Sequence, residues 1–180
     1  MTLMELFAGV LGYPDERMPL LRSELLTRTG SELPAAAGPL HRYLDATAGM
    51  SCASLCELYT RTFDLMAVCS PYAGIHLYGE DNYKRGGLMA RLNESFTAQH
   101  FDAGSELPDH LAVLLRYSAA APAEEADELC EYLLQAPVAA MISILSKTQN
   151  PYTHLLESLQ IALSASASMR IQPLSATEGS

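Results

Sequence analysis

Apolar residues recur at helical spacing along almost the whole of this chain, and this periodicity constrains its fold more than any other feature. Near the N-terminus, Leu3, Leu6 and Val10 share one helical face. Thr2 and Glu5 are spaced as the capping box that begins such a helix. No segment alternates apolar and polar residues as a half-buried strand does, and Val and Ile are sparse. The pattern therefore predicts an all-α protein.

Proline, glycine and capping residues divide the periodic sequence into a series of expected helices. A loop containing Pro34 is expected at 30–38. Pro108 is expected in the first turn of its helix, where its missing N–H costs no hydrogen bond. The expected helices cover residues 3–11, 16–27, 39–48, 51 or 54 to 64, 71–78, 81–99, 108–118, 122 onward, 137–147 and 151–167.

The length of the chain fits one domain. It has 180 residues, of which 49% are apolar, and domains average about 100–200 residues. We expect residues 1–167 to form a single helical domain and residues 168–180 to form a disordered tail. Only 18% of the residues are charged, against about 25% in average proteins, so more apolar surface than usual should be exposed. This composition favours a partner-binding groove.

The net charge of the chain argues against one class of partner. It is −10, which disfavours binding to the phosphates of nucleic acid. It suits a cationic partner, although solubility alone explains such a charge more often. The N-terminus lacks the basic region of a secretory signal, and the most apolar segment, 136–145, is far shorter than the ~20 residues that span a bilayer. We therefore expect a cytoplasmic protein that does not insert into a membrane.

Catalytic and metal-binding motifs are not found in the sequence. It has no glycine-rich phosphate loop, no H-E-x-x-H motif and no nucleophile elbow. Cys52 and Cys56 lie one helical turn apart, but no second pair completes a ligand set. Buried structural thiols are therefore expected there, with Cys69 and Cys130 also free. We expect no catalytic activity, no cofactor and no metal.

Three polar clusters interrupt the helical pattern, at Tyr59–Leu65, His76–Gly86 and Glu106–Leu111. Each has an ordinary structural explanation. The first is an amphipathic helix end, and in the third Asp109 complements the dipole of a helix that starts at Pro108. On composition alone, none of the clusters therefore requires a function.

The second cluster has two features of its own. Asp81 with Arg85, and Glu80 with Lys84, are spaced as ion pairs one helical turn apart. Gly86–Gly87 would cost a helix about 1 kcal/mol per residue relative to Ala. Such a cost suggests that another helix or a ligand comes close at these glycines.

In their order and spacing, the three clusters resemble the NarJ/TorD family of cytoplasmic chaperones that mature molybdenum-containing redox enzymes. The motifs are Y-T-R-T-F-D-L at 59–65, H-L-Y-G-E-D-N-Y-K-R-G at 76–86 and E-L-P-D-H-L at 106–111, with a weaker match at Leu11–Pro14. Leu107 separates Glu106 from Pro108, a spacing nearer to the NarJ branch, which commonly has Tyr where His110 stands. The resemblance implies a single all-helical bundle of the TorD-like type without catalytic activity.

The resemblance also implies a partner. Such chaperones bind the N-terminal leader of a molybdopterin oxidoreductase catalytic subunit, often a twin-arginine leader or its remnant. They hold the apo-subunit until the molybdopterin guanine dinucleotide cofactor is inserted. Arginines followed by an apolar stretch need carboxylates and a groove, and Asp109 is expected to accept hydrogen bonds from a leader arginine. The expected peptide-binding residues are Tyr59, Phe63, Asp64, His76, Tyr78, Glu80, Arg85, Glu106, Pro108, Asp109 and His110.

Two other classes of function stay open at this point. The main alternative is a permanent, non-catalytic helical subunit of an oxidoreductase complex. A small enzyme or nucleotide-binding protein is the third class, although no phosphate-cradling motif supports it. The sequence decides neither the client enzyme nor whether the chain forms a homodimer.

Overall fold

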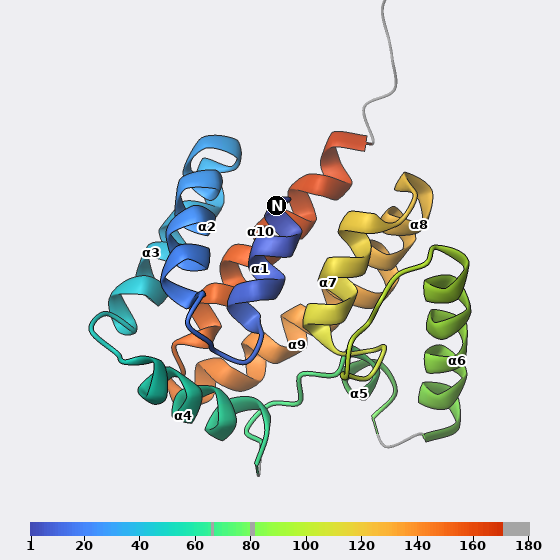
Figure 1. The fold of residues 1–180 in the computed structure, drawn as a ribbon, viewed down its shortest axis with the longest axis horizontal. Coiled ribbons are helices and arrows are strands. Elements are labelled where there is room, and N and C mark those ends of the chain that lie inside the picture. The colour runs from blue at the N-terminus through green and yellow to red at the C-terminus, as the bar shows by residue number, and fades with distance from the viewer. Residues whose placement is uncertain (66, 80–81, 171–180) are drawn as a thin grey trace, which may run out of the picture.

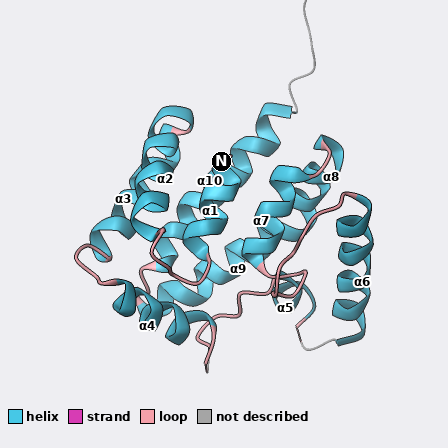
Figure 2. Ribbon diagram, viewed as in Figure 1, coloured by secondary structure: helices cyan, strands magenta, loops and turns pink. Residues whose placement is uncertain are grey.

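The computed structural model describes residues 1–65, 67–79 and 82–170 and confirms the all-α prediction, since no β-strand occurs among them. Figure 2 shows the helices and the loops that join them. The helices are α1 (Leu3–Leu11), α2 (Met18–Glu32), α3 (Pro34–Ala46), α4 (Cys52–Phe63), α5 (Ala73–Tyr78), α6 (Asn82–Ala98), α7 (Leu111–Ala120), α8 (Ala123–Leu129), α9 (Gln135–Leu145) and α10 (Tyr152–Arg170). A π-helical turn at Cys130–Leu134 joins α8 to α9, and a 3₁₀ turn at Ser146–Thr148 follows α9.

Helices α1 and α10 occupy the middle of the bundle, as Figure 1 shows. Helix α10 packs against α3 and α9, and α1 packs against α2 and α7. Helix α6 stands at the outer edge beyond α7. The central helices bury large side chains completely, among them Phe7 of α1, Tyr117 of α7 and Tyr152 of α10. Burial of this apolar surface is the main force that holds the bundle together.

Aromatic rings join α4 to the centre of the bundle. The ring of Phe63, at the end of α4, packs edge to face on Tyr152 with their centroids 4.8 Å apart. Tyr59, one turn earlier, lies 5.3 Å from Phe63 and 6.5 Å from Tyr152. The first polar cluster therefore begins in the hydrophobic core, and only its C-terminal end reaches the surface.

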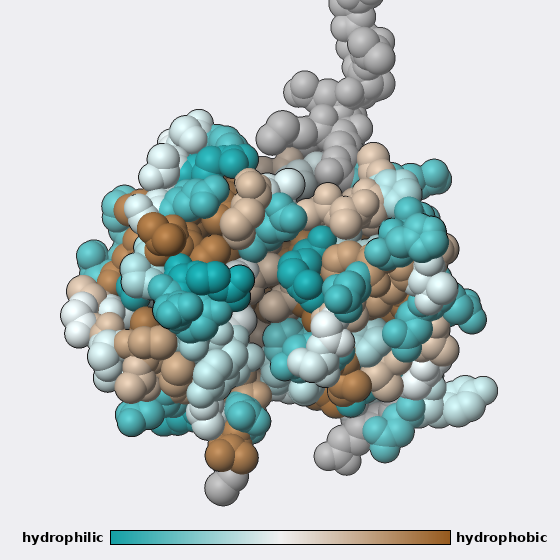
Figure 3. All heavy atoms as spheres, in the orientation of Figure 1, coloured by the Kyte–Doolittle hydropathy of each residue, from teal (hydrophilic) through white to brown (hydrophobic). Residues whose placement is uncertain are grey.

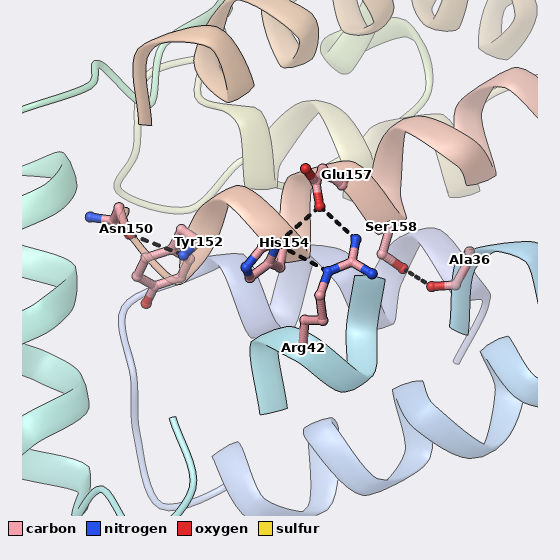
Figure 4. Close-up of polar contacts among 7 residues, drawn as sticks. All are labelled: Ala36, Arg42, Asn150, Tyr152, His154, Glu157 and Ser158. Atoms are coloured by element: carbon pink, nitrogen blue, oxygen red, sulfur yellow. Dashed lines mark hydrogen bonds and ion pairs between the residues drawn. The ribbon is translucent and has the colours of Figure 1, made fainter. Parts of the chain in front are cut away.

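Polar contacts fix α10 along α3, as the close-up in Figure 4 shows. The buried hydroxyl of Ser158 donates a hydrogen bond of 2.8 Å to the carbonyl oxygen of Ala36. At the preceding residue of α10, the carboxylate of Glu157 binds the guanidinium of Arg42 of α3 at 3.0 Å. A buried hydroxyl needs a partner, so the Ser158 bond sets where α10 can sit along α3.

The prediction of a loop at 30–38 is wrong. Helix α2 continues to Glu32, and α3 begins at Pro34, so that Leu33 alone separates them. Proline is well suited to the first helical position because its fixed φ angle is already helical. Pro39, which was expected to begin a helix, lies inside α3.

The C-terminal end of the fold extends past the expected boundary at residue 167, because α10 continues to Arg170. The rest of the expected tail, 171–180, lies outside the described residues. The continuous helical run 123–148, which joins α8 to α9, is long and apolar enough to cross a membrane by length and composition. Core helices of soluble proteins pass the same test, so this run is weak evidence for a membrane span.

Candidate functional site

The second and third polar clusters meet at an isolated β-bridge between Tyr72 and His110. The backbone N–H of Ala73 donates to the carbonyl oxygen of Asp109 at 2.8 Å. The rings of Tyr72 and His110 pack edge to face with their centroids 5.5 Å apart. The bridge therefore ties the loop before α5 to the loop before α7, although these loops are far apart in sequence.

Beside the bridge, Asp109 is bound by a residue of its own chain. Its carboxylate is fully buried and accepts two hydrogen bonds from Arg85, of 2.7 Å from Nε and 3.1 Å from Nη2. The Arg85 guanidinium also lies 5.2 Å from the centre of the Tyr72 ring. The hydrogen bonds to Asp109 raise the pKa of Arg85, so the guanidinium stays positively charged beside the carboxylate. Asp109, which was expected to accept hydrogen bonds from a leader arginine, therefore has both carboxylate oxygens occupied by Arg85 in the free chain.

Gly74 makes this ion pair sterically feasible. A Cβ atom at Gly74 would lie 2.6 Å from Oδ2 of Asp109 and 3.0 Å from Cγ of Arg85. Only glycine leaves room for the pair, and the sequence analysis missed this position. It placed the close approach at Gly86 and Gly87 instead, where a Cβ would meet no atom within 4 Å among the described residues.

His110 caps the N-terminus of helix α7, so the helix begins later than the expected start at Pro108. The helix starts at Leu111, and Nδ1 of the His110 ring accepts a hydrogen bond of 3.2 Å from the backbone N–H of Ala112. Burial lowers the pKa of His110, against the opposing effects of Glu106 and Asp109. The ring is therefore neutral near pH 7, with its proton on Nε2.

Two exposed carboxylates, Asp64 and Glu106, act on the same two tyrosines. Burial raises the pKa of Tyr59 to about 12, and the negative charges of Glu106 and Asp64 add to this effect. The same two carboxylates also act on Tyr72, again after burial, and raise its pKa. Asp64 and Glu106 belong to different loops, yet the negative charges of both act on Tyr59 and Tyr72.

Exposed apolar side chains either follow these carboxylates in the chain or pack on the ring of Tyr59. Tyr13 is 60% exposed and packs edge to face on Tyr59, with a centroid separation of 5.3 Å. Leu65 and Leu107, which follow the two carboxylates, are 73% and 43% exposed. We call Tyr13, Asp64, Leu65, Glu106 and Leu107 the loop surface. In Figure 3, apolar spheres project at the lower end of the molecule, where the loop after α4 extends below the bundle.

In the described part of the chain, a small void lies among residues that adjoin the loop surface. The void among Phe63, Pro71, His110 and Leu111 measures about 10 Å³, which holds at most one water molecule. This void is too small for a peptide side chain, so a peptide that binds here would lie across the described loop surface rather than enter it.

The structure gathers most of the expected binding residues but gives them different environments. Tyr59, Phe63, Asp109 and His110 are buried, whereas Asp64 and Glu106 are exposed. His76 lies half-buried, with Nε2 at 2.8 Å from the carbonyl oxygen of Ser70, so it holds the loop before α5. Tyr78 lines a separate groove beside α6, and Pro108 is half-buried before His110. Glu80, with the expected pairs of Glu80 and Asp81, lies outside the described residues.

The cysteine pair on α4 is more accessible than expected. Cys52 is exposed and Cys56 is half-buried, so neither is a buried structural thiol. The Cys56 thiol donates to the carbonyl oxygen of Pro14 at 3.3 Å, which ties α4 to the loop after α1. In the described part of the chain, no three His, Cys, Asp or Glu side chains are grouped to hold a metal ion.

Comparisons with known proteins agree on one family. The family model described as nitrate reductase delta subunit matches residues 28–157, which contain all three polar clusters. A Bacillus subtilis (strain 168) protein named as a nitrate reductase molybdenum cofactor assembly chaperone, NarJ, is 31% identical over 157 residues, or 86% of this chain and 84% of that protein. The crystal structure of a candidate redox enzyme maturation protein from Archaeoglobus fulgidus matches with a TM-score of 0.62 and 19% identity, over 89% of this chain and 91% of that chain. At this identity, the structural match concerns the fold alone.

Proposed function

Because this chain belongs to the nitrate reductase delta subunit family, we propose that it is a cytoplasmic assembly chaperone for a molybdopterin oxidoreductase. The family match agrees with the NarJ/TorD resemblance of the three motifs. In the proposed cycle, the chain binds the N-terminal leader of the catalytic subunit and holds the apo-subunit until the molybdenum cofactor is inserted. It then leaves the mature enzyme, and it catalyses no reaction itself.

The loop surface carries the leader-binding part of this proposal. Asp64 and Glu106 are exposed carboxylates whose charges act on the same two tyrosines, and each is followed in the chain by an exposed leucine. A leader arginine would donate charge-assisted hydrogen bonds to these carboxylates. The apolar residues that follow the arginines would cover Tyr13, Leu65 and Leu107, which are exposed in the free chain.

The buried members of the three motifs have a supporting role in this proposal. Asp109 is fully buried and bound by Arg85, so it positions the loop that carries Glu106. The bridge between Tyr72 and His110 ties that loop to the loop after α4, which carries Asp64. A rigid support of this kind limits the conformational entropy that the loops lose when a peptide binds.

The decisive experiment co-expresses this chain with the catalytic subunit of the molybdopterin oxidoreductase encoded nearest to its gene. We expect the subunit made without the chain to contain little molybdenum and to have little activity, and co-expression to restore both. The mature, cofactor-loaded enzyme should purify without the chain.

Two outcomes of this experiment contradict the proposal. If the chain remains at one copy per mature enzyme, it is the permanent helical subunit that the sequence left open. If molybdenum content and activity are the same with and without the chain, it is not an assembly chaperone for that enzyme. A leader peptide that shows no binding in calorimetry removes the leader-binding part alone.

A further inference from the structure

Two thiols on α4 take no part in the proposed function, yet they lie side by side. Cys52 is the first residue of α4 and is exposed, and Cys56, one helical turn later, is half-buried. Burial raises the pKa of Cys52, and a side-chain hydrogen bond with Cys56 raises it further. The two sulfur atoms are therefore close to each other at the start of the helix.

The spacing of the two thiols suits an ion between them better than a disulfide. Residues four apart on an α-helix have Cβ atoms about 5–6 Å apart, whereas a disulfide needs Cβ atoms about 3.5–4.5 Å apart. A disulfide between Cys52 and Cys56 would therefore distort the first turn of α4. Metal–thiolate bonds of about 2.3 Å allow an ion to hold two sulfurs up to about 4.6 Å apart. The intact helix can accept such an ion.

A cavity of about 350 Å³ beside Cys52 is lined by further sulfur atoms. Met50 and Met18 line it together with Cys52. Met50 lies two residues before Cys52 and is 37% exposed, whereas Met18 is the first residue of α2 and is 2% exposed. Thiolate and thioether sulfurs are soft ligands, which prefer soft cations such as Cu(I) to Mg²⁺ or Ca²⁺. The cavity therefore has the donor chemistry of a soft-metal site.

The charges around this cavity are compatible with two thiolates. Arg22 lines the cavity, and its Nη2 donates a hydrogen bond of 2.6 Å to Oγ1 of Thr47, which fixes the guanidinium nearby. A Cu(I) ion bound by two thiolates has one net negative charge, so this guanidinium stabilises the complex. Asp15 and Glu16 also line the cavity, and both act on Arg17, which Asp15 binds at 2.6 Å. Acidic and basic side chains are thus both present, and the sulfur donors decide which ion fits.

The number of donors distinguishes between soft metals. Structural zinc sites and iron–sulfur clusters generally use four protein ligands, which is why the sequence predicts no metal at this pair. Within the described residues, no three His, Cys, Asp or Glu side chains are grouped to complete such a set. Cu(I), in contrast, accepts linear coordination by two thiolates, with a thioether as a weaker third ligand.

We propose that Cys52 and Cys56 form a binding site for Cu(I), with Met50 as a weaker third ligand. On binding, two Cu–S bonds form to the cysteines, both S–H bonds break and the two protons pass to solvent, while the copper stays Cu(I). The hydrogen bond of 3.3 Å from the Cys56 thiol to the carbonyl oxygen of Pro14 is then lost. Tyr13 shares a side-chain hydrogen bond with Cys56, and its O–H can donate to the bound sulfur instead.

The test is a competition for Cu(I) in the absence of oxygen. The full chain, reduced and free of metal, is titrated into the coloured Cu(I) complex of bicinchoninate. We expect the chain to remove about one equivalent of Cu(I), which lowers the visible absorbance of the chelator complex, and to gain ultraviolet absorption from thiolate-to-copper charge transfer. Zn(II) should bind at least about tenfold more weakly, because it lacks its usual four ligands here.

Matched variants test the individual ligands. Cys52→Ser and Cys56→Ser should each weaken Cu(I) binding at least about a hundredfold, and Met50→Leu should weaken it about three- to tenfold. Cys130→Ala and Met89→Leu remove sulfur atoms on other helical segments and should change the affinity less than about twofold. Circular dichroism of each variant checks that it folds.

Three results would overturn the proposal. Failure to remove copper from the chelator, or equal removal by Cys52→Ser, Cys56→Ser and the wild type, would show that the pair is not the site. Binding of Zn(II) as tight as that of Cu(I) would show that the site prefers a different class of ion. A disulfide between Cys52 and Cys56 that persists in the folded, reductant-treated chain would make the pair a structural cross-link.

Discussion

Arg85 and Asp109 are paired across 24 residues of sequence, and their two hydrogen bonds link the first turns of α6 to the residue before the cap of α7. The carboxylate is fully buried, whereas 16% of the Arg85 side chain stays exposed. A carboxylate in that environment would be strongly destabilising without its partner. The pair therefore holds α6 against the loop before α7, which the Tyr72–His110 bridge ties in turn to the loop before α5.

Breaking this pair should destabilise the protein. Asp109→Asn removes the charge that compensates Arg85, and we expect the free energy of unfolding to fall by about 3 kcal/mol. Urea denaturation measures this change. Asp102→Asn is the matched control because Asp102 is exposed, and it should change stability by less than about 0.5 kcal/mol. If Asp109→Asn unfolds normally but loses leader binding, Asp109 contacts the leader directly and our structural assignment is wrong.

Two glycine-to-alanine substitutions should change the free energy of unfolding in opposite directions. Gly74→Ala places a methyl group 2.6 Å from Oδ2 of Asp109, which forces the ion pair apart and should cost about 1–3 kcal/mol. Gly87→Ala meets open space in a helix and should stabilise the protein by up to about 1 kcal/mol. Thermal unfolding of the two variants compares them directly. A stable Gly74→Ala protein would mean that the pair does not form as described.

His110 should make stability depend on pH in the acid range. Burial lowers its pKa in the folded chain below the ordinary 6.5. As the pH falls below about 6.5, the unfolded chain binds a proton at His110 before the folded chain does, so stability decreases. This loss levels off once the pH is below the folded pKa.

His110→Asn tests this pH dependence while keeping a side chain that can cap α7. The difference in urea midpoint between pH 7.5 and pH 5.5 should be smaller in this variant than in the wild type. His41 is exposed, and His41→Asn should leave that difference unchanged. An unchanged difference in His110→Asn would show that the ring titrates normally.

The loop surface can be tested by neutralising its carboxylates. Asp64→Asn and Glu106→Gln should each weaken binding of the client leader by about 1 kcal/mol, or roughly fivefold, at low salt. Calorimetry measures the affinity, and the difference from wild type should shrink as salt is added. Glu24→Gln on the exposed face of α2 is the control for net charge. Similar weakening by all three substitutions would show that the leader senses only the overall charge.

The four cysteines should differ in their rates of alkylation. Cys52 is exposed, whereas Cys69 is 2% and Cys130 is 7% exposed. Burial also raises the pKa of the Cys69 thiol to about 12, so little reactive thiolate forms there. Mass spectrometry after brief treatment with iodoacetamide should find Cys52 modified first in the native protein. Equal modification of all four would indicate that the core opens readily.

Features that depend on neighbouring residues could be predicted from the sequence. The capping box of Thr2 and Glu5 is present, with the Glu5 N–H donating to Thr2 Oγ1 at 3.2 Å. Gly12 ends α1 as expected. Such features were correct because the residues that determine them lie within one or two turns of each other. The loop at 30–38 was wrong because Pro34 is equally suited to a turn and to the first residue of a helix.

Features that depend on tertiary packing could not be predicted. The sequence indicated that Asp109 and Arg85 matter, but nothing local shows that they bind each other. Likewise, Tyr78 was grouped with the leader-binding residues by its motif, whereas the fold places it in the groove beside α6. The requirement for Gly74 arises only once α5, α6 and the loop before α7 are assembled.

Helix α6 has seventeen residues but buries only Leu88, Leu92 and Phe96, so it is attached to the bundle more lightly than α1 or α10. Elements with few buried side chains open at a lower free energy than the whole protein unfolds. Helix α6 forms one wall of the groove that Tyr78 lines. The opposite wall belongs to the continuous helical run of α8 and α9, whose residues reach the centre of the core. A molecule that contacts both walls therefore stabilises the attached state of α6 by mass action, and occupancy of the groove becomes thermodynamically coupled to the order of that helix.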